Sequence, residues 1–242
     1  MTDFDDQIEQ LLQRWESALG RPTCGPGCDR CCRRKSVLMT SCEALSLAEH
    51  PRSRLDFASL REAIALRCAR LRRALPAGPD EALNALLDLG PCVFLESRKC
   101  SVYEARPDGC RAALVWHEAW YCGRSEYDQC VPAELNEIRV ARAYVRMLDE
   151  LDAGRRPYWG QILPAIWLML ERGDEYAAGA DLAAGLDPEW IGAELLEFPD
   201  RARLLREQAE HEAIFRDEAF PLGSPRAAEC DSRQDLRAFR ID

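Results

Sequence analysis

Four cysteines stand within nine residues at positions 24–32, in the stretch CGPGCDRCC. Thiolates surround a metal ion at about 2.3 Å, and short spacings between cysteines bring their sulfurs close enough to do so. Cys24, Cys28 and Cys31 have spacings of this kind. Adjacent residues usually point their side chains apart, so the Cys31–Cys32 pair indicates two neighbouring ions, a polynuclear cluster, or one ligand beside a redox thiol. The chemistry expected of this stretch is metal binding or redox chemistry through sulfur.

A second, looser group of cysteines follows further along the chain. Its spacings are too wide to define a site locally, so the fold has to bring these thiols together. The candidate functional thiols of this group are Cys92, Cys100, Cys110 and Cys122. Cys130, the last of the group, is more typical of a buried small hydrophobic residue. The same interpretation applies to the scattered cysteines, which are Cys42, Cys68 and Cys230.

The three histidines offer less chemistry than the cysteines. His117 lies between Cys110 and Cys122, where it can act as a ligand or proton carrier. A lone histidine beside Trp116 and Trp120 is, however, more often a partly buried core residue. We therefore leave His117 outside the predicted ligand set.

Charge and composition narrow the class of protein. The chain has 242 residues and a formal net charge of −10, which argues against a general nucleic-acid binder because phosphate contacts need a basic surface. The N-terminus lacks the positive and apolar regions of a secretory signal, and the apolar run 162–170 is far shorter than the roughly 20 residues of a membrane span. We expect a cytoplasmic protein that contacts no membrane. In the cytoplasm, clustered cysteines more often bind metal or do redox chemistry than form disulfides.

The hydrophobic pattern predicts a mainly α fold in which two irregular, cysteine-bearing segments are joined by a metal site. The irregular segments are 21–36 and 90–130, and a short hairpin is predicted near 92–103. Thr40 and Glu43 form a capping-box pattern that opens a helix to about His50. Other helices are predicted at 3–19, 53–75 and 80–89. From Pro132 onward the chain is predicted to be almost wholly helical, at 132–152, 158–172, 175–184, 188–196 and 198–215.

This organisation divides the chain into three predicted parts. Residues 1–130 form a cysteine-cluster region that binds metal. Residues 131–220 form a helical extension packed on that region. Residues 221–242 form a loosely ordered tail.

The cysteine segments resemble a known family. CGPGCDRCC, followed by PCVFLESRKCSVYEARPDGCR and then YCG, is similar to the pattern of the YkgJ-type cysteine-cluster proteins. The similarity spans residues 24–123 and places Tyr103, Arg106, Pro107 and Arg111 in register. It implies chelation of zinc or iron, with an iron–sulfur cluster as one form. The implied metal ligands are Cys24, Cys28, Cys31, Cys32, Cys92, Cys100, Cys110 and Cys122.

The identity of the metal stays open at this point, because thiolate sets suit zinc, iron–sulfur clusters and Cu(I) alike. Eight thiolates divide into two four-thiolate zinc sites, or hold one four-iron cluster with thiols left over. Cys24, Cys28 and Cys31 also have the spacing of radical S-adenosylmethionine enzymes. Those enzymes use a partial βα barrel, and the chain shows no alternation of strands and helices. Arginines near the thiols are expected to favour the thiolate form.

Three functions follow from this pattern. The first is a metalloprotein whose metal acts in redox chemistry, metal handling or modification of a protein or peptide partner. The second is a non-enzymatic interaction module in which zinc only holds loops together. The third is sequestration of Cu(I) or heavy metals. The pattern does not decide whether the protein is an enzyme.

Overall fold

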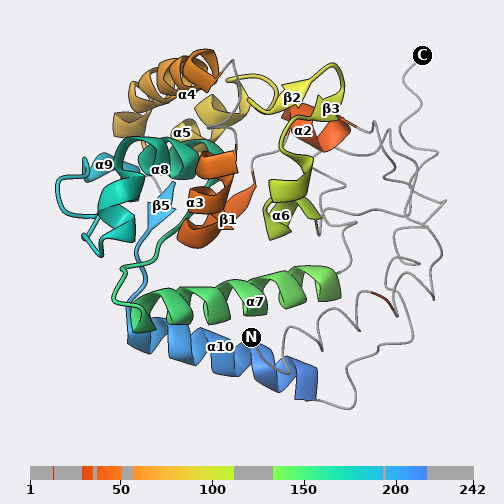
Figure 1. Ribbon diagram of the computed structural model, residues 1–242, viewed down its shortest axis with the longest axis vertical. Coiled ribbons are helices and arrows are strands. Elements are labelled where there is room, and N and C mark those ends of the chain that lie inside the picture. Colours follow the sequence, from red (N-terminus) through yellow and green to blue (C-terminus); the bar gives the residue numbers. More distant parts are fainter. Residues whose placement is uncertain are drawn as a thin grey trace.

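The structure is a computed structural model that describes residues 13, 29–34, 37–50, 57–111, 133–192 and 195–216. Helices dominate these residues, which confirms the predicted mainly α fold (Figure 1). The longer helices are α3 (Ser41–Glu49), α4 (Phe57–Arg72), α5 (Pro79–Leu87), α7 (Ala133–Asp152), α8 (Ile162–Ala177) and α10 (Arg201–Arg216). Short helical segments are α2 (Arg30–Arg34), η2 (Leu75–Ala77), η3 (Tyr103–Ala105), α6 (Asp108–Arg111) and α9 (Glu189–Gly192).

Some predictions fall on other parts of the chain. The predicted tail 221–242 and the predicted domain boundary near residue 131 lie outside the described residues, as does the predicted helix 3–19 apart from the helical Gln13. Among the described residues, no helix combines the length and the apolar character that a membrane span requires.

The start of α3 shows how local sequence fixes this part of the fold. The Thr40 hydroxyl accepts a hydrogen bond from the backbone N–H of Glu43, and the Glu43 carboxylate accepts one from the backbone N–H of Thr40 at 2.8 Å. This reciprocal pair satisfies two backbone donors that the helix cannot satisfy itself. The predicted capping box is confirmed, and the helix ends at Glu49, with His50 as its C-cap.

The main hydrophobic core lies where α3 and α4 pack against α8. Leu47 from α3, Ile64 from α4 and Leu168 from α8 are fully buried there. The same core takes Phe94 and Val102, which flank a short hairpin. A smaller cluster joins α7 to α10, which lie side by side at the edge of the molecule (Figure 1).

A three-stranded antiparallel sheet corrects the prediction that the chain beyond Pro132 is almost wholly helical. Its strands are β1 (Leu38–Thr40), β4 (Trp159–Gln161) and β5 (Leu196–Glu197), in the order β1-β4-β5. A Cβ atom on Gly160 would lie 2.5 Å from Leu196 Cδ2 and 3.1 Å from the carbonyl oxygen of Leu195, so the close approach of the strands favours glycine there. Strands of two or three residues are too short to show the alternation by which sequence patterns reveal strands.

Further helix predictions also need correction. The predicted helix 158–172 begins at Ile162 because β4 takes its first residues, and it continues to Ala177. Turns replace most of the predicted helix 175–184, and the predicted helix 188–196 shortens to Glu189–Gly192. In the predicted irregular segment 21–36, Arg30–Arg34 are helical.

The hairpin predicted near 92–103 is confirmed. It consists of β2 (Leu95–Glu96) and β3 (Lys99–Cys100), in which Leu95 pairs with Cys100. The connecting Ser97 and Arg98 both have positive φ angles, 46° and 66°. Tight two-residue hairpin turns use this conformation because its twist matches that of the strands. The turn thereby fixes Cys100 opposite Leu95.

Candidate metal centre

Backbone and ion-pair contacts join the two cysteine-bearing segments. The backbone N–H of Cys92 donates to the carbonyl oxygen of Cys32 at 2.6 Å. The Asp29 carboxylate, before α2, accepts from Arg33 Nη2 at 2.7 Å and lies 3.6 Å from Nε of Arg98 in the hairpin turn. The hydrogen bond from Arg33 holds the pKa of Asp29 below its usual value. The loop before residue 34 and the hairpin are therefore neighbours, although 60 or more residues separate them in the chain.

Five of the eight predicted ligands belong to the described residues, and their thiols gather in one region. They are Cys31, Cys32, Cys92, Cys100 and Cys110. The Cys31 thiol is close enough for its charge to raise the pKa of each of the other four. It is hydrogen-bonded to Cys32, which raises the pKa of the Cys32 thiol most strongly. One helical turn thus brings a thiol into reach of the hairpin and of α6.

Burial is the main cause of the raised pKa at the thiols outside α2. It raises the pKa of Cys92 to about 11, and it also raises the pKa of Cys100 and of Cys110. Arg67 and Arg106 oppose this effect, but they do not overcome it. The expectation that nearby arginines favour thiolates needs correction for the described thiols, because burial outweighs the arginines there.

The Arg33 side chain adds a reason for that correction, because it pairs with Asp29 instead of a sulfur. A metal ion that binds these thiols must displace their protons. Metal binding at this centre is therefore expected to weaken as the pH falls.

The donor set fits a thiophilic metal in its chemistry. Zinc, iron–sulfur clusters and Cu(I) all take thiolate sulfur. Within the part of the chain that the structure describes, no three His, Cys, Asp or Glu side chains form a metal-binding group. Cys24, Cys28 and Cys122 lie outside that part, as do Cys130, His117 and Cys230. The eight-cysteine ligand set therefore stays a prediction.

The other two described cysteines lie apart from this group. Cys68 is buried in the main core, with its Sγ 3.8 Å from the carbonyl oxygen of Leu163, as expected for a small hydrophobic residue. Cys42 lies at the start of α3, where its Sγ is 3.0 Å from Thr40 Oγ1. Burial raises the pKa of Cys42 to about 11. It borders a cavity, which its interpretation as an ordinary core residue did not anticipate.

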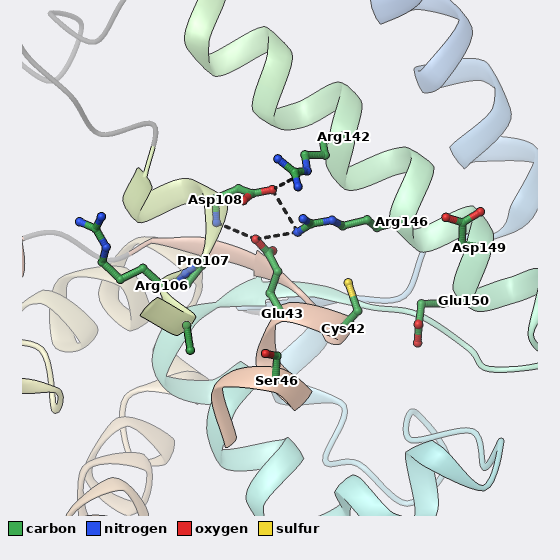
Figure 2. A pocket seen from close by; sticks show the side chains of 11 residues that line it. Cys42, Glu43, Ser46, Arg106, Pro107, Asp108, Arg142, Arg146, Asp149 and Glu150 are labelled. Carbon is green, nitrogen blue, oxygen red and sulfur yellow. Dashed lines mark hydrogen bonds and ion pairs between the residues drawn. The ribbon is translucent and has the colours of Figure 1, made fainter. Parts of the chain in front are cut away.

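A network of charged side chains holds the turn that carries Cys110. The backbone N–H of Asp108 donates to Glu43 Oε1 at 2.7 Å. The Asp108 carboxylate lies 3.0 Å from Arg146 and 3.3 Å from Arg142, both on α7 (Figure 2). The turn is thus fixed from α3 on one side and from α7 on the other. We call Glu43, Asp108, Arg142 and Arg146 the α6 clamp.

The clamp lies beside a cavity of about 460 Å³ between α3, the segment before α6, and α7. Its lining residues are Cys42, Glu43, Ser46, Ala105, Arg106, Pro107, Asp108, Arg142, Arg146, Asp149 and Glu150. The sequence shows that Arg142 and Arg146 share one face of a helix, being four residues apart. It carries no signal that this face meets Asp108, so the cavity was not predicted.

Arg106 lines the cavity, and its charge also acts on the thiols of Cys100 and Cys110. Its guanidinium stacks over the Tyr103 ring at 3.6 Å, and its Nε donates to the Tyr103 carbonyl oxygen at 3.1 Å. Arg106 also lowers the pKa of Cys100 and Cys110 to a small extent. It is placed to offset negative charge on these sulfurs.

Comparisons with known proteins give one family. Residues 23–131 match the model of the CxxCxxCC family, which carries the description "Putative zinc- or iron-chelating domain". Searches of curated proteins and of solved structures each found no match. The matched range contains all eight predicted ligands and ends before α7. The predicted resemblance to the YkgJ-type cysteine-cluster proteins is therefore confirmed for residues 23–131, which match the model of this family.

Proposed function

We propose that the protein binds zinc or iron through thiolates from residues 24–32 and 92–122, and that the metal carries its function. The observation that supports this most is the position of Cys31, whose charge acts on thiols from both segments. Cysteines kept only as small hydrophobic residues have no reason to converge from distant parts of a chain. The role of the metal is redox chemistry, metal handling or modification of a partner.

The residues around the thiols suit a bound metal. Zinc held by thiolates supplies a Lewis acid or a structural link, and an iron–sulfur cluster supplies electron transfer. Thiolates around either group carry net negative charge, which the Arg106 guanidinium offsets. The α6 clamp positions the turn of Cys110 from two helices.

The packing favours a functional metal over a metal that only holds loops together. Phe94 and Val102 are 2% and 1% exposed, and they anchor both ends of the hairpin in the main core. A backbone hydrogen bond joins Cys92 to Cys32, and Asp29 pairs with Arg33 and Arg98. These contacts position the described parts of the cysteine segments, residues 29–34 and 92–111, without metal, whereas a loop-holding zinc is needed where such contacts are lacking.

Anaerobic purification, followed by a visible spectrum and by metal and sulfide analysis, tests this proposal. Iron with acid-labile sulfide and broad visible absorption would identify a cluster. A colourless protein with about two zinc ions and no sulfide would identify thiolate zinc. Several Cu(I) ions per chain would favour sequestration. Protein purified without any metal, and unable to take up zinc or iron under reducing conditions, would contradict the proposal.

A further inference from the structure

The cavity beside the α6 clamp has the properties of a small-molecule site. Its volume of about 460 Å³ lies within the range typical of ligand pockets. Apart from Ala105 and Pro107, every residue that lines it has a polar or charged side chain or a thiol. It combines residues of the CxxCxxCC segment with residues of α7, beyond the range that matches the family. A ligand here must be polar, and its recognition depends on the part of the chain outside the family match.

Most carboxylates of the cavity already have partners. Glu43 accepts from Thr40 and from the backbone of Asp108, and Asp108 pairs with arginines of α7. Glu150 accepts two hydrogen bonds from Arg155 and one from the Tyr176 hydroxyl. These three groups are therefore part of the wall and are not available to a ligand.

Two groups on α7 remain for a ligand. Both contacts of Arg146 to carboxylates run through Nη1, so its other guanidinium nitrogens have no acceptor among the described residues. Asp149 is exposed, and its carboxylate has no partner among the residues that the structure describes. Being three residues apart, they lie on one face of the helix. The cavity thus presents an anion-binding group and a cation-binding group, both from α7 (Figure 2).

The charges around the cavity nearly cancel. Four carboxylates and three guanidiniums line it, and Arg155 compensates Glu150 from outside. An anionic ligand would be repelled by Asp149, and a cationic ligand would be repelled by Arg146. A ligand that carries both charges satisfies both. Ser46 and Cys42 add small neutral groups on the opposite wall in α3 (Figure 2).

We propose that this cavity binds a small zwitterion of the amino-acid class, with its carboxylate on Arg146 and its ammonium on Asp149. This site is distinct from the thiols and goes beyond the metal function proposed above. It needs no metal ligand, and its occupancy is measured separately from metal content.

Isothermal titration calorimetry of the full chain, as purified with its metal, tests the site with free L-amino acids as probes. At least one amino acid should bind, while its N-acetyl derivative, which lacks the ammonium, and its amide, which lacks the carboxylate, should each bind at least about tenfold more weakly. Binding of neither the amino acids nor any derivative would overturn the proposal. Equal binding of the N-acetyl form or of the amide would also overturn it, by showing an anion or a cation site.

Two variants and two controls complete the test. Arg146→Gln and Asp149→Asn should each lower the affinity at least about tenfold. Asp152→Asn and Arg201→Gln, which break an exposed ion pair between α7 and α10, should leave it unchanged. Since Asp149 is exposed and has no partner among the described residues, its variant folds even where that of Arg146 does not. Unchanged affinity in Asp149→Asn would contradict the proposal, whatever the metal content of the same sample.

Discussion

The thiol group and the α6 clamp meet in α6, which carries both Cys110 and Asp108, and their buried polar groups differ in how they are compensated. In the clamp, every carboxylate meets a guanidinium, a hydroxyl or a backbone N–H, so its charges are compensated within the protein. At the thiols, burial and neighbouring sulfurs raise the pKa, and Arg67 and Arg106 compensate negative charge there only in part. The clamp carboxylates have partners within the protein, whereas the raised pKa of the thiols favours their neutral form. This difference favours our proposal that the thiols bind the metal and that the clamp supports them.

The largest expected effect is on metal content, and it distinguishes the thiol group from the α6 clamp most clearly. Cys31→Ser and Cys100→Ser each remove a thiolate ligand. If the metal is zinc, each variant should lose at least half of the bound ions; if it is an iron–sulfur cluster, each should lose the cluster. Cys230→Ser is the matched control and should keep the full metal content. Inductively coupled plasma mass spectrometry of the three variants measures this. Equal metal content in all of them would contradict the ligand assignment.

The next effect concerns the hydrophobic anchor of the hairpin. Phe94→Ala should lower the free energy of unfolding by about 3–5 kcal/mol, because it leaves a cavity in the main core. Removal of the metal by a chelator should leave the helical circular-dichroism signal largely intact, since that core needs no metal.

Thermal and urea denaturation, with and without chelator, measure these two changes side by side. Leu66→Ala, at a side chain that is 60% exposed, is the control and should change stability little. Complete unfolding on chelation would favour the loop-holding zinc instead.

A moderate effect is expected from the clamp. Asp108→Asn removes the charge opposite Arg142 and Arg146, and it should cost about 1–3 kcal/mol of unfolding free energy. It should also speed metal release to a competing chelator, because the turn of Cys110 loses its hold on α7. Asp152→Asn, whose ion pair with Arg201 is exposed, should change neither quantity. If the variant released metal at the same rate as the unmodified protein, the clamp would have no role in holding the metal.

The smallest expected effect is a pH dependence at Glu150. Burial raises the pKa of this carboxyl, but hydrogen bonds from Arg155 and Tyr176 outweigh burial, so the pKa is lowered overall. A lowered pKa stabilises the fold at pH values above the ordinary value of 4.5, and this stabilisation is lost as the pH falls through the lowered pKa. Tyr176→Phe should reduce it by about 1 kcal/mol at neutral pH. Denaturation curves between pH 3 and pH 7, at fixed ionic strength, give the free energy of unfolding as a function of pH. If this account is wrong, that dependence on pH is the same in Tyr176→Phe as in the unmodified protein.

The sequence predicted those features that depend on neighbouring residues. The capping box at Thr40 and Glu43 and the hairpin at Ser97 and Arg98 are of this kind, because each is determined by a few adjacent residues. The cysteine spacings likewise predicted the family.

Features that depend on distant pairing were missed or were not predictable. Strand β4 pairs with β1 across more than 100 residues, and neither strand is long enough to show a pattern. The clamp requires α7 to contact α6, and the sequence of neither helix by itself predicts this contact. The raised pKa of the thiols follows from burial, which charge counts along the chain cannot show.

X-ray absorption at the metal edge tests the central claim most directly, because it reports the atoms bound to the metal. The account predicts a first shell of sulfur at about 2.3 Å for either zinc or iron, and in Cys100→Ser a shell with less sulfur. A first shell made only of nitrogen and oxygen would contradict it, as would a shell that is the same in the variant and in the unmodified protein.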